Sequence, residues 1–335
     1  MSSVEIVPFS EDHIEAAASL VAARYRTERE LNKSLPARYE KPDAILERLR
    51  PFANGRADIA VMCQGQLKGF LLGLIFPLRG VRTAWSPDWG HAVNPVRDYE
   101  TYREMYTALA PRWVANGCFD HAVTVLAHER AVSDAWFSLG FGMAGIDALR
   151  DLSPVKGAPS KVEIRRATLE DIDVVLRLTV GLQRHLATSP IFMPLMTYRE
   201  RRFHEEWLSN RDKVLWLASL SREIVGHMRL GPVDAPYAPM PVSDKETVAI
   251  SGAFAWEDHR SRGIGTALLD HSLQWARSAG YKNCSVDFES ANILGSRFWH
   301  RSGFRPVCYS LVRRIDERIA WAHENRDEID LLRGL

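Results

Sequence analysis

The sequence predicts an α/β (α+β) fold built twice, as two tandem domains that each hold a mixed central sheet flanked by helices. Three observations predict it. Similar blocks recur in the same order, strand-like and helix-like patterns alternate in both halves, and a stretch with two prolines and a glycine separates the halves. A length of 335 residues suits two domains of ordinary size. We therefore expect one domain at residues 1–155 and a second at 156–335.

The first repeated block opens each domain. VEIVPFSEDHI at 4–14 resembles VEIRRATLEDI at 162–172, which begins 158 positions later. Each reads as a short alternating strand followed by a Ser or Thr of the kind that caps a helix, with acids in the first helical turn. Ser10 and Thr168 are therefore expected to mark the start of the first helix in each domain.

Two more blocks follow in the same order. Residues 57–76 and 213–231 each read as two strands joined by a polar turn. Residues 121–142 and 283–305 each read as a strand and a helix, and share a Trp, a Gly and a Phe at an offset of 163. Generic alternation of strands and helices can give single matches by chance, but three blocks at similar offsets favour a duplication. The run 317–335 predicts a closing helix.

The composition is that of a soluble globular protein, with 46% hydrophobic and 25% charged residues. Lys+Arg 43 against Asp+Glu 42 gives a net charge of +1, so we expect neither a nucleic-acid nor a membrane partner. The N-terminus has no secretory pattern, and no run is long enough to span a membrane. Four widely spaced cysteines indicate reduced thiols rather than disulfides or zinc. These observations predict a cytoplasmic protein without a metal.

The strongest chemical signal lies in residues 247–281. An apolar strand, about Val248–Trp256, leads into a turn with Gly263 and Gly265, and an amphipathic helix follows. A glycine turn that opens a helix leaves unpaired N–H groups at the helix's positive end, which suits a diphosphate. Glycines there let phosphate oxygens approach the backbone closely. A simple tight turn is the alternative interpretation of two glycines alone.

The residues that follow make the signal specific. After the helix come an alternating strand at 284–289, then Asn292, Phe298-Trp299 and Gly303-Phe304. On these residues the chain resembles the GNAT N-acetyltransferase superfamily over about 162–314. The family's motif (Arg or Gln)-x-x-Gly-x-(Gly or Ala) is matched by Arg260, Gly263 and Gly265. A dinucleotide site of the Rossmann type is disfavoured, because the turn comes late in its domain.

The resemblance implies acetyl-CoA as co-substrate, lying in a V between two strands and attacked directly by an acceptor amine. The acceptor would be a primary amine of a small molecule or a peptide, and the protein a monomer or homodimer. The residues implied in cofactor binding are Phe254, Ala255, Trp256, Arg260, Arg262, Gly263, Ile264, Gly265, Thr266, Asn292 and Trp299.

The first copy lacks the glycine turn. Its counterpart, residues 91–106, contains Pro95 and no glycine, and Glu129 stands where the second copy has Asn292. We therefore expect a degenerate GNAT-like domain at 1–155 and the working site in the second domain. A divergent second active site is the alternative.

The second copy departs from the family pattern at its acid and base. Ser251 and Ala249 stand where many members place a Glu or His base, and Trp299 stands where a Tyr acid is usual. Asp287 and Glu289 share one strand face, so they are the preferred bases, although solvation or ion pairing would also explain them. Tyr309 is the candidate acid. Trp299 is expected to pack or to form a wall for the cofactor.

The acceptor region is predicted at residues 182–198. This segment contains His185 and a Phe192/Met193/Met196 cluster, which is either an apolar lid or core between two helices. Since neither base nor acid stands in its usual position, a non-catalytic acyl-CoA sensor is the main rival. A transferase that takes an aminoacyl group from tRNA is a third possibility, against which the near-neutral charge and the intact glycine turn weigh.

Overall fold

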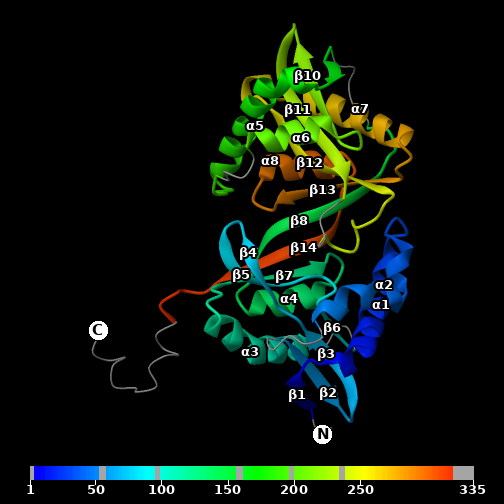
Figure 1. Cartoon of the computed structure of the whole chain (residues 1–335), viewed down its shortest axis with the longest axis vertical. Coiled ribbons are helices and arrows are strands. Elements are labelled where there is room, and N and C mark those ends of the chain that lie inside the picture. The colour runs from blue at the N-terminus through cyan, green and yellow to red at the C-terminus, as the bar shows by residue number, and fades with distance from the viewer. Residues whose placement is uncertain are drawn as a thin grey trace. The chain divides into compact units, whose positions relative to one another are not determined.

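The computed structural model describes residues 4–52, 58–94, 99–155, 161–195, 200–233 and 238–319 (Figure 1). The chain divides into unit 1, Met1–Ala144 with Cys308–Leu335, and unit 2, Gly145–Val307. This division differs from the predicted boundary at 155, because the last strand of each copy pairs in the other unit. A strand exchange of this kind leaves no mark on local sequence patterns. The predicted closing helix falls mainly on residues 320–335, outside the described part of the chain.

Unit 1 orders its strands β1-β2-β3-β6 in one sheet and β4-β5-β7-β14 in another. Its core is rich in aromatic residues, and Trp113 and Trp136 are buried in it. The strands are β1 Val4–Pro8, β2 Ile59–Cys63, β3 Gln66–Leu71, β4 Leu74–Leu78, β5 Val81–Ser86, β6 His91–Val93, β7 Asp120–Leu126 and β14 Arg305–Arg314. The helices are α1 Ile14–Leu31, α2 Pro42–Leu49, α3 Tyr99–Ala115 and α4 Arg130–Ser138.

Unit 2 has one mixed sheet in the order β8-β13-β12-β11-β10-β9, in which β12 and β13 are parallel. The strands are β8 Gly142–Asp151, β9 Glu163–Arg166, β10 Val214–Leu220, β11 Glu223–Pro232, β12 Thr247–Ala255 and β13 Asn283–Glu289. The helices are α5 Ile172–Ala187, α6 Arg201–Ser209, α7 Ile264–Ser278 and α8 Ile293–Arg301.

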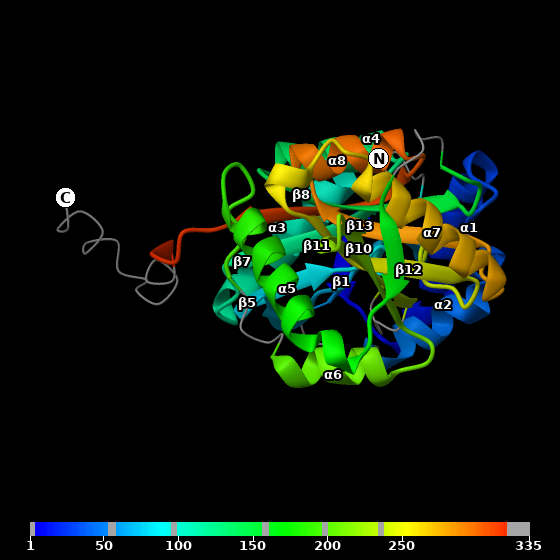
Figure 2. The ribbon, with the colours of Figure 1, turned by 90° about the horizontal axis from the view of Figure 1, so that it is seen from above.

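Helices cover both faces of the unit 2 sheet. On β10, Leu215 and Leu217 pack in the cluster that includes residues of α5 and α6, which lie next to each other (Figure 2). Trp216, between them in sequence, packs instead against His271 of α7, with ring centroids 4.4 Å apart. Alternate strand residues face opposite sides of a sheet, so α5 and α6 cover one face and α7 covers the other.

The structure confirms the duplication. Both hairpins, β2–β3 and β10–β11, carry a register shift just beyond an aligned glycine pair, Val61↔Gly69 in one and Ala218↔Gly226 in the other. The matched aromatic pairs are also equivalent. Trp136 contacts Phe141 edge-on at 5.0 Å, and Trp299 contacts Phe304 edge-on at 5.3 Å. The repeated sequence blocks therefore mark the same structural elements in both copies.

Helix α5, which carries part of the site, is anchored at its start by Asp171. Arg165 donates to both Asp171 carboxylate oxygens at 2.8 and 2.6 Å, and the Thr168 N–H donates at 2.9 Å. The Arg165 hydrogen bonds are the main reason why the pKa of Asp171 is lowered to about 2. Thr168 precedes the short turn that leads into α5, as the sequence predicts.

We expect Asp171→Asn to cost about 1–2 kcal/mol of stability at pH 7, since it removes a charged hydrogen-bond acceptor and half of a capping box. A lowered carboxyl pKa stabilises the fold above its unfolded value near 3.8, and this contribution is lost as pH falls toward 2. Urea unfolding of both proteins at several pH values measures the difference, with Glu170→Gln as a control in the same turn. A difference that stays constant from pH 7 to pH 2 contradicts the prediction.

Candidate functional site

Strand β12 pairs with β13 along only half of its length. Their parallel register runs from Thr247↔Asn283 to Ile250↔Val286, whereas β12 stays paired with β11 as far as Ala255. The β11–β12 register shifts at Ser251, the position of a β-bulge, which bends a strand and increases its twist. Among the described residues, the β13 side of Ser251–Ala255 has no partner strand. We call this stretch the open edge.

Only alternate residues of β12 direct their backbone groups to the open edge. The Trp256 N–H donates to the Val225 carbonyl of β11 at 3.0 Å. Consecutive strand residues point their backbone groups to opposite edges, so Phe254 also faces β11, while Ala253 and Ala255 face the open edge. Of the three residues predicted to offer backbone groups, Ala255 alone therefore directs them to the open edge.

The cradle turn, Arg260–Thr266, joins the open edge to helix α7. Gly263 has φ 78° and ψ 3°, a left-handed conformation that favours glycine, and α7 begins at the next residue. No described residue accepts a hydrogen bond from the N–H groups of 262–266, whereas the Ala267 N–H donates to the Gly263 carbonyl at 2.9 Å. The predicted row of unpaired donors is thus present at the positive end of α7.

Two residues of the cradle turn have contacts that the sequence did not indicate. A Cβ on Gly265 would lie 3.1 Å from the Phe298 ring, so the small size of Gly265 serves the contact between α7 and α8. The sequence analysis attributed this glycine to the close approach of a phosphate, whereas the structure shows that the Phe298 ring limits the size of residue 265. The Arg260 Nε donates to the Ala255 carbonyl at 3.2 Å, which ties the turn to the open edge.

His185 and Asn292 meet beside the cradle turn. Asn292 caps α8, since its Oδ1 accepts from the Gly295 N–H at 2.9 Å, and its side chain also hydrogen-bonds to His185 of α5. Burial and the positive charge of Arg260 lower the pKa of His185, while the Asn292 bond and Glu257 act in the opposite sense. The structure thus brings together His185, Arg260 and Asn292 from three separate elements.

Gly181 explains why α5 reaches this position. A Cβ on Gly181 would lie 2.7 Å from the Phe254 ring and 2.8 Å from the Trp256 ring. The absence of a side chain therefore lets α5 lie directly on the end of β12. Since residues four apart share a helix face, the next turn presents His185 near the open edge. The sequence placed His185 in the acceptor region but gave it no catalytic role.

The structure places the predicted bases and the predicted acid in different parts of the protein. Asp287 is exposed and Glu289 half-buried, and they alternate with Phe288, which contacts His300 of α8. The two carboxylates therefore share the opposite face, as predicted. Tyr309 pairs with Val125 and packs against the core of unit 1, so it belongs to unit 1 and not to the predicted second domain.

Two more predicted residues have defined surroundings. Trp299 is buried against Phe298 and Phe304, which makes it part of the core of unit 2 rather than a wall of the open edge. The Ser251 hydroxyl accepts from the Arg229 Nε at 3.1 Å. In the acceptor region Phe192 is 70% exposed, which excludes the core alternative for that residue. Met196 lies outside the described residues.

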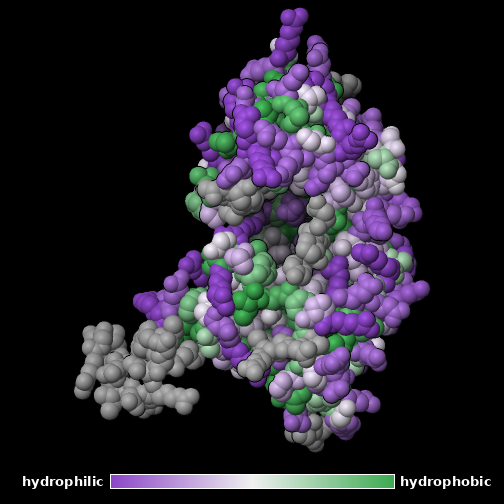
Figure 3. All heavy atoms as spheres, in the orientation of Figure 1, coloured by the Kyte–Doolittle hydropathy of each residue, from purple (hydrophilic) through white to green (hydrophobic). Residues whose placement is uncertain are grey.

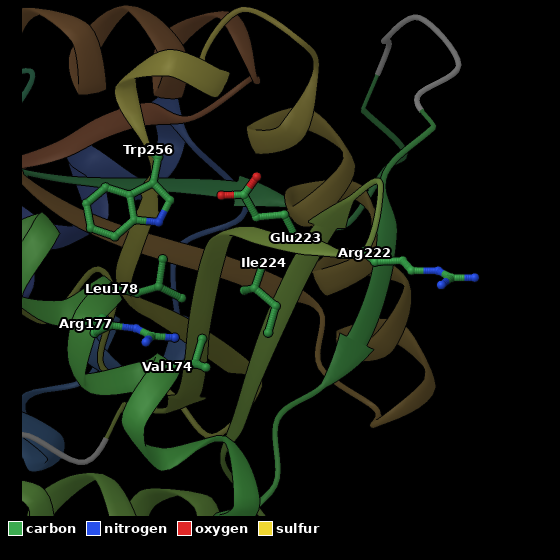
Figure 4. Close-up of a pocket in the computed structure, with 7 residues that line it drawn as sticks. All are labelled: Val174, Arg177, Leu178, Arg222, Glu223, Ile224 and Trp256. Carbon is green, nitrogen blue, oxygen red and sulfur yellow. The ribbon is translucent and has the colours of Figure 1, made fainter.

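A pocket of about 330 Å³ lies on the other side of Trp256, toward the β10–β11 hairpin (Figure 4). Figure 3 shows apolar side chains gathered on the surface over α5 and this hairpin. Figure 4 shows the indole of Trp256 and Glu223 at one end, and Arg222 pointing away. The pocket is lined by Val174, Arg177, Leu178, Arg222, Glu223, Ile224 and Trp256. The hairpin residues that line it lie on the β11 side of β12, opposite to β13.

The described residues of unit 1 form no counterpart of the open edge. The strand equivalent to β12 is divided, since β6 pairs with β3 while β5 pairs in parallel with β7. Glu129 precedes α4 as Asn292 precedes α8. Its carboxylate lies 3.3 Å from the Arg24 Nε, and the side chains of Glu129 and Arg24 are 9% and 1% exposed. A divided strand and a buried ion pair therefore stand where unit 2 has the open edge and Asn292.

The family model for the Acetyltransferase (GNAT) family matches residues 183–304, which include the open edge, the cradle turn and Asn292. Residues 183–304 therefore match the pattern of a GNAT acetyltransferase domain, and this match covers 122 of the 335 residues. Human N-acetyltransferase 8 is 27% identical over 103 residues, which are 31% of this chain and 43% of that protein. The chain thus covers less than half of the length of that relative.

Two solved structures have the same fold over 93% of this chain. A GCN5-related N-acetyltransferase from Sphaerobacter thermophilus has a TM-score of 0.61 at 13% identity, with 95% of that chain covered. A tandem GNAT protein from the clavulanic acid biosynthesis pathway has a TM-score of 0.52 at 16% identity, with 98% covered. These likenesses confirm the predicted tandem GNAT fold.

Within the described ranges, no helix combines the length and hydropathy of a transmembrane segment.

Proposed function

We propose that this protein is an acetyl-CoA-dependent N-acetyltransferase whose single working site lies in unit 2. The observation that carries the proposal is the row of unpaired N–H groups at 262–266, adjoining the open edge of β12. An anion is stabilised at a helix N-terminus by such donors and by the helix dipole. The side chains of Arg260 and Arg262 add positive charge to the same turn.

The residues present fit acetyl-CoA, which when bound supplies an activated acetyl thioester. The N–H groups of 262–266 would hold its diphosphate, and the backbone groups of Ala253 and Ala255 would align its extended arm. Preorganised backbone donors of this kind also stabilise negative charge that develops on a carbonyl oxygen. Asn292, placed at the start of α8, would contact the arm from the β13 side.

The acceptor in this proposal is a primary amine of a small molecule or a peptide. An alkylamine with a pKa of about 10 is mainly protonated at pH 7, so the site has to accept a proton before or during attack. The segment that follows α5 lies close to His185 in sequence. In it, the Met193 N–H donates to the Leu186 carbonyl and Phe192 is exposed. We propose that the acceptor amine binds on this side of the site.

Calorimetric titration with acetyl-CoA, followed by mass analysis of an amine panel incubated with it, tests the proposal. We expect one acetyl-CoA per chain, and at least one amine that gains one acetyl group faster than in buffer. Absence of acetyl-CoA binding contradicts the proposal. Binding without transfer to any amine favours the acyl-CoA sensor instead.

A further inference from the structure

His185 has a fixed position at the open edge of unit 2. It lies one turn beyond Gly181, whose missing side chain sets α5 directly on Phe254 and Trp256. Its side chain hydrogen-bonds to Asn292 at the start of α8, and Arg260 and Glu257 of the preceding turn are its charged neighbours. The ring is therefore held where the open edge, the cradle turn and α8 come together.

The positions that usually supply a base in this family do not supply one here. Ala249 has no ionisable group, and the Ser251 hydroxyl is engaged by Arg229. Asp287 is exposed on β13, whereas Glu289 and the ring of His185 are both half-buried. Of these groups, His185 is the one whose surroundings include Arg260 of the cradle turn and Asn292 at the start of α8.

We propose that His185 accepts the proton that the acceptor amine loses during acetyl transfer, an inference that rests on the proposed function. In this step the neutral amine nitrogen forms a bond to the acetyl carbon, and the carbon–sulfur bond breaks with its electron pair leaving on sulfur. The proton passes from nitrogen to the imidazole, and from there to the thiolate or to water. No further reactant is needed.

The surroundings of His185 suit a base at neutral pH. Burial and the positive charge of Arg260 disfavour the imidazolium and lower the pKa below the usual 6.5, and Glu257 and the Asn292 hydrogen bond offset only part of this effect. The imidazole is thus neutral at pH 7 and free to take a proton. The resulting imidazolium is stabilised by Glu257 and Asn292.

The first experiment compares kcat/KM across pH for the wild type and His185→Gln, with the amine found in the panel. Glutamine keeps a polar partner for Asn292 but cannot act as a base. The wild-type kcat/KM should fall as pH is lowered through the His185 pKa. In the variant we expect that acidic limb to disappear and kcat/KM at neutral pH to fall by about 100-fold, with acetyl-CoA affinity changed by less than about threefold.

The matched control is His271→Gln. His271 is also partly buried with a lowered pKa, but it packs against Trp216 on the face of the sheet covered by α7. It should keep the wild-type profile. A His185→Gln protein that keeps the acidic limb and its activity overturns the inference, and so does one that loses acetyl-CoA binding, since the residue would then serve the cofactor site. If the wild type itself does not bind acetyl-CoA, the proposed function fails instead.

A second experiment needs no turnover. Asn292→Asp keeps a good helix cap but adds a negative charge beside His185. We expect the His185 pKa, followed by NMR titration of the protein alone, to rise by about one unit, and the His271 pKa to stay the same. An unchanged His185 pKa overturns the contact on which the inference rests.

Discussion

Gly263→Asp is expected to weaken acetyl-CoA binding by at least about 100-fold, the equivalent of about 2.7 kcal/mol. The substitution places a carboxylate at the start of α7, where the unpaired N–H groups of 262–266 would otherwise meet the diphosphate. Two like charges at close range in a partly desolvated turn repel strongly. Calorimetric titration of the purified variant measures the change.

Gly263→Asn is the matched control for that experiment. Asparagine is nearly the same size as aspartate and tolerates the left-handed conformation of residue 263, so the two variants differ mainly in charge. We expect its acetyl-CoA affinity to stay within about tenfold of the wild type. Equal losses in the Asp and Asn variants would mean that backbone strain, and not repulsion of an anion, causes the effect. Unchanged binding in both would remove the cradle turn from the proposal.

Arg24→Ala is expected to destabilise the protein by about 3–5 kcal/mol, because it leaves the Glu129 carboxylate buried without its ion partner. Arg24 also donates to the carbonyls of Asp88 and His91, which would lose that donor. Urea-induced unfolding followed by circular dichroism gives the change in the free energy of unfolding.

The double variant Arg24→Met/Glu129→Gln serves as the control, since it removes both charges while keeping similar volumes. It should recover the part of the loss that comes from the unpaired Glu129 charge, whereas the carbonyls of Asp88 and His91 still lack their donor. At a temperature where all variants are folded, acetyl-CoA affinity should match that of the wild type, because the pair lies in unit 1. A cost below about 1 kcal/mol for Arg24→Ala would show that the buried pair does not hold unit 1 together.

Local patterns were enough to predict the repeated elements. The strand, capping residue and helix at 162–187, the hairpin of β10 and β11, and the Trp–Phe pairs all depend on residues close together in sequence. The exchange of β8 and β14 could not be predicted in this way, because either strand has the alternation needed to complete either sheet. Tyr309 was assigned to the wrong unit for the same reason.

The candidate site, too, was predictable only where it depends on residues close together in sequence. The cradle turn follows from glycine spacing before an amphipathic helix, a local signal. His185 depends on Gly181, whose significance is visible only once α5 lies against Phe254 and Trp256. The bulge at Ser251 determines that the backbone groups of Ala255 point to the open edge, and a bulge cannot be predicted from residue types alone. The sequence thus reveals the cradle turn, whereas the residues that surround it are brought there by tertiary packing.

A crystal structure of the protein grown with acetyl-CoA would show where the diphosphate binds. We expect one bound molecule, with its diphosphate oxygens within hydrogen-bonding distance of the N–H groups of Gly263, Ile264 and Gly265 and its arm along the open edge of β12. A diphosphate bound in unit 1, or bound in unit 2 away from those N–H groups, would contradict this expectation.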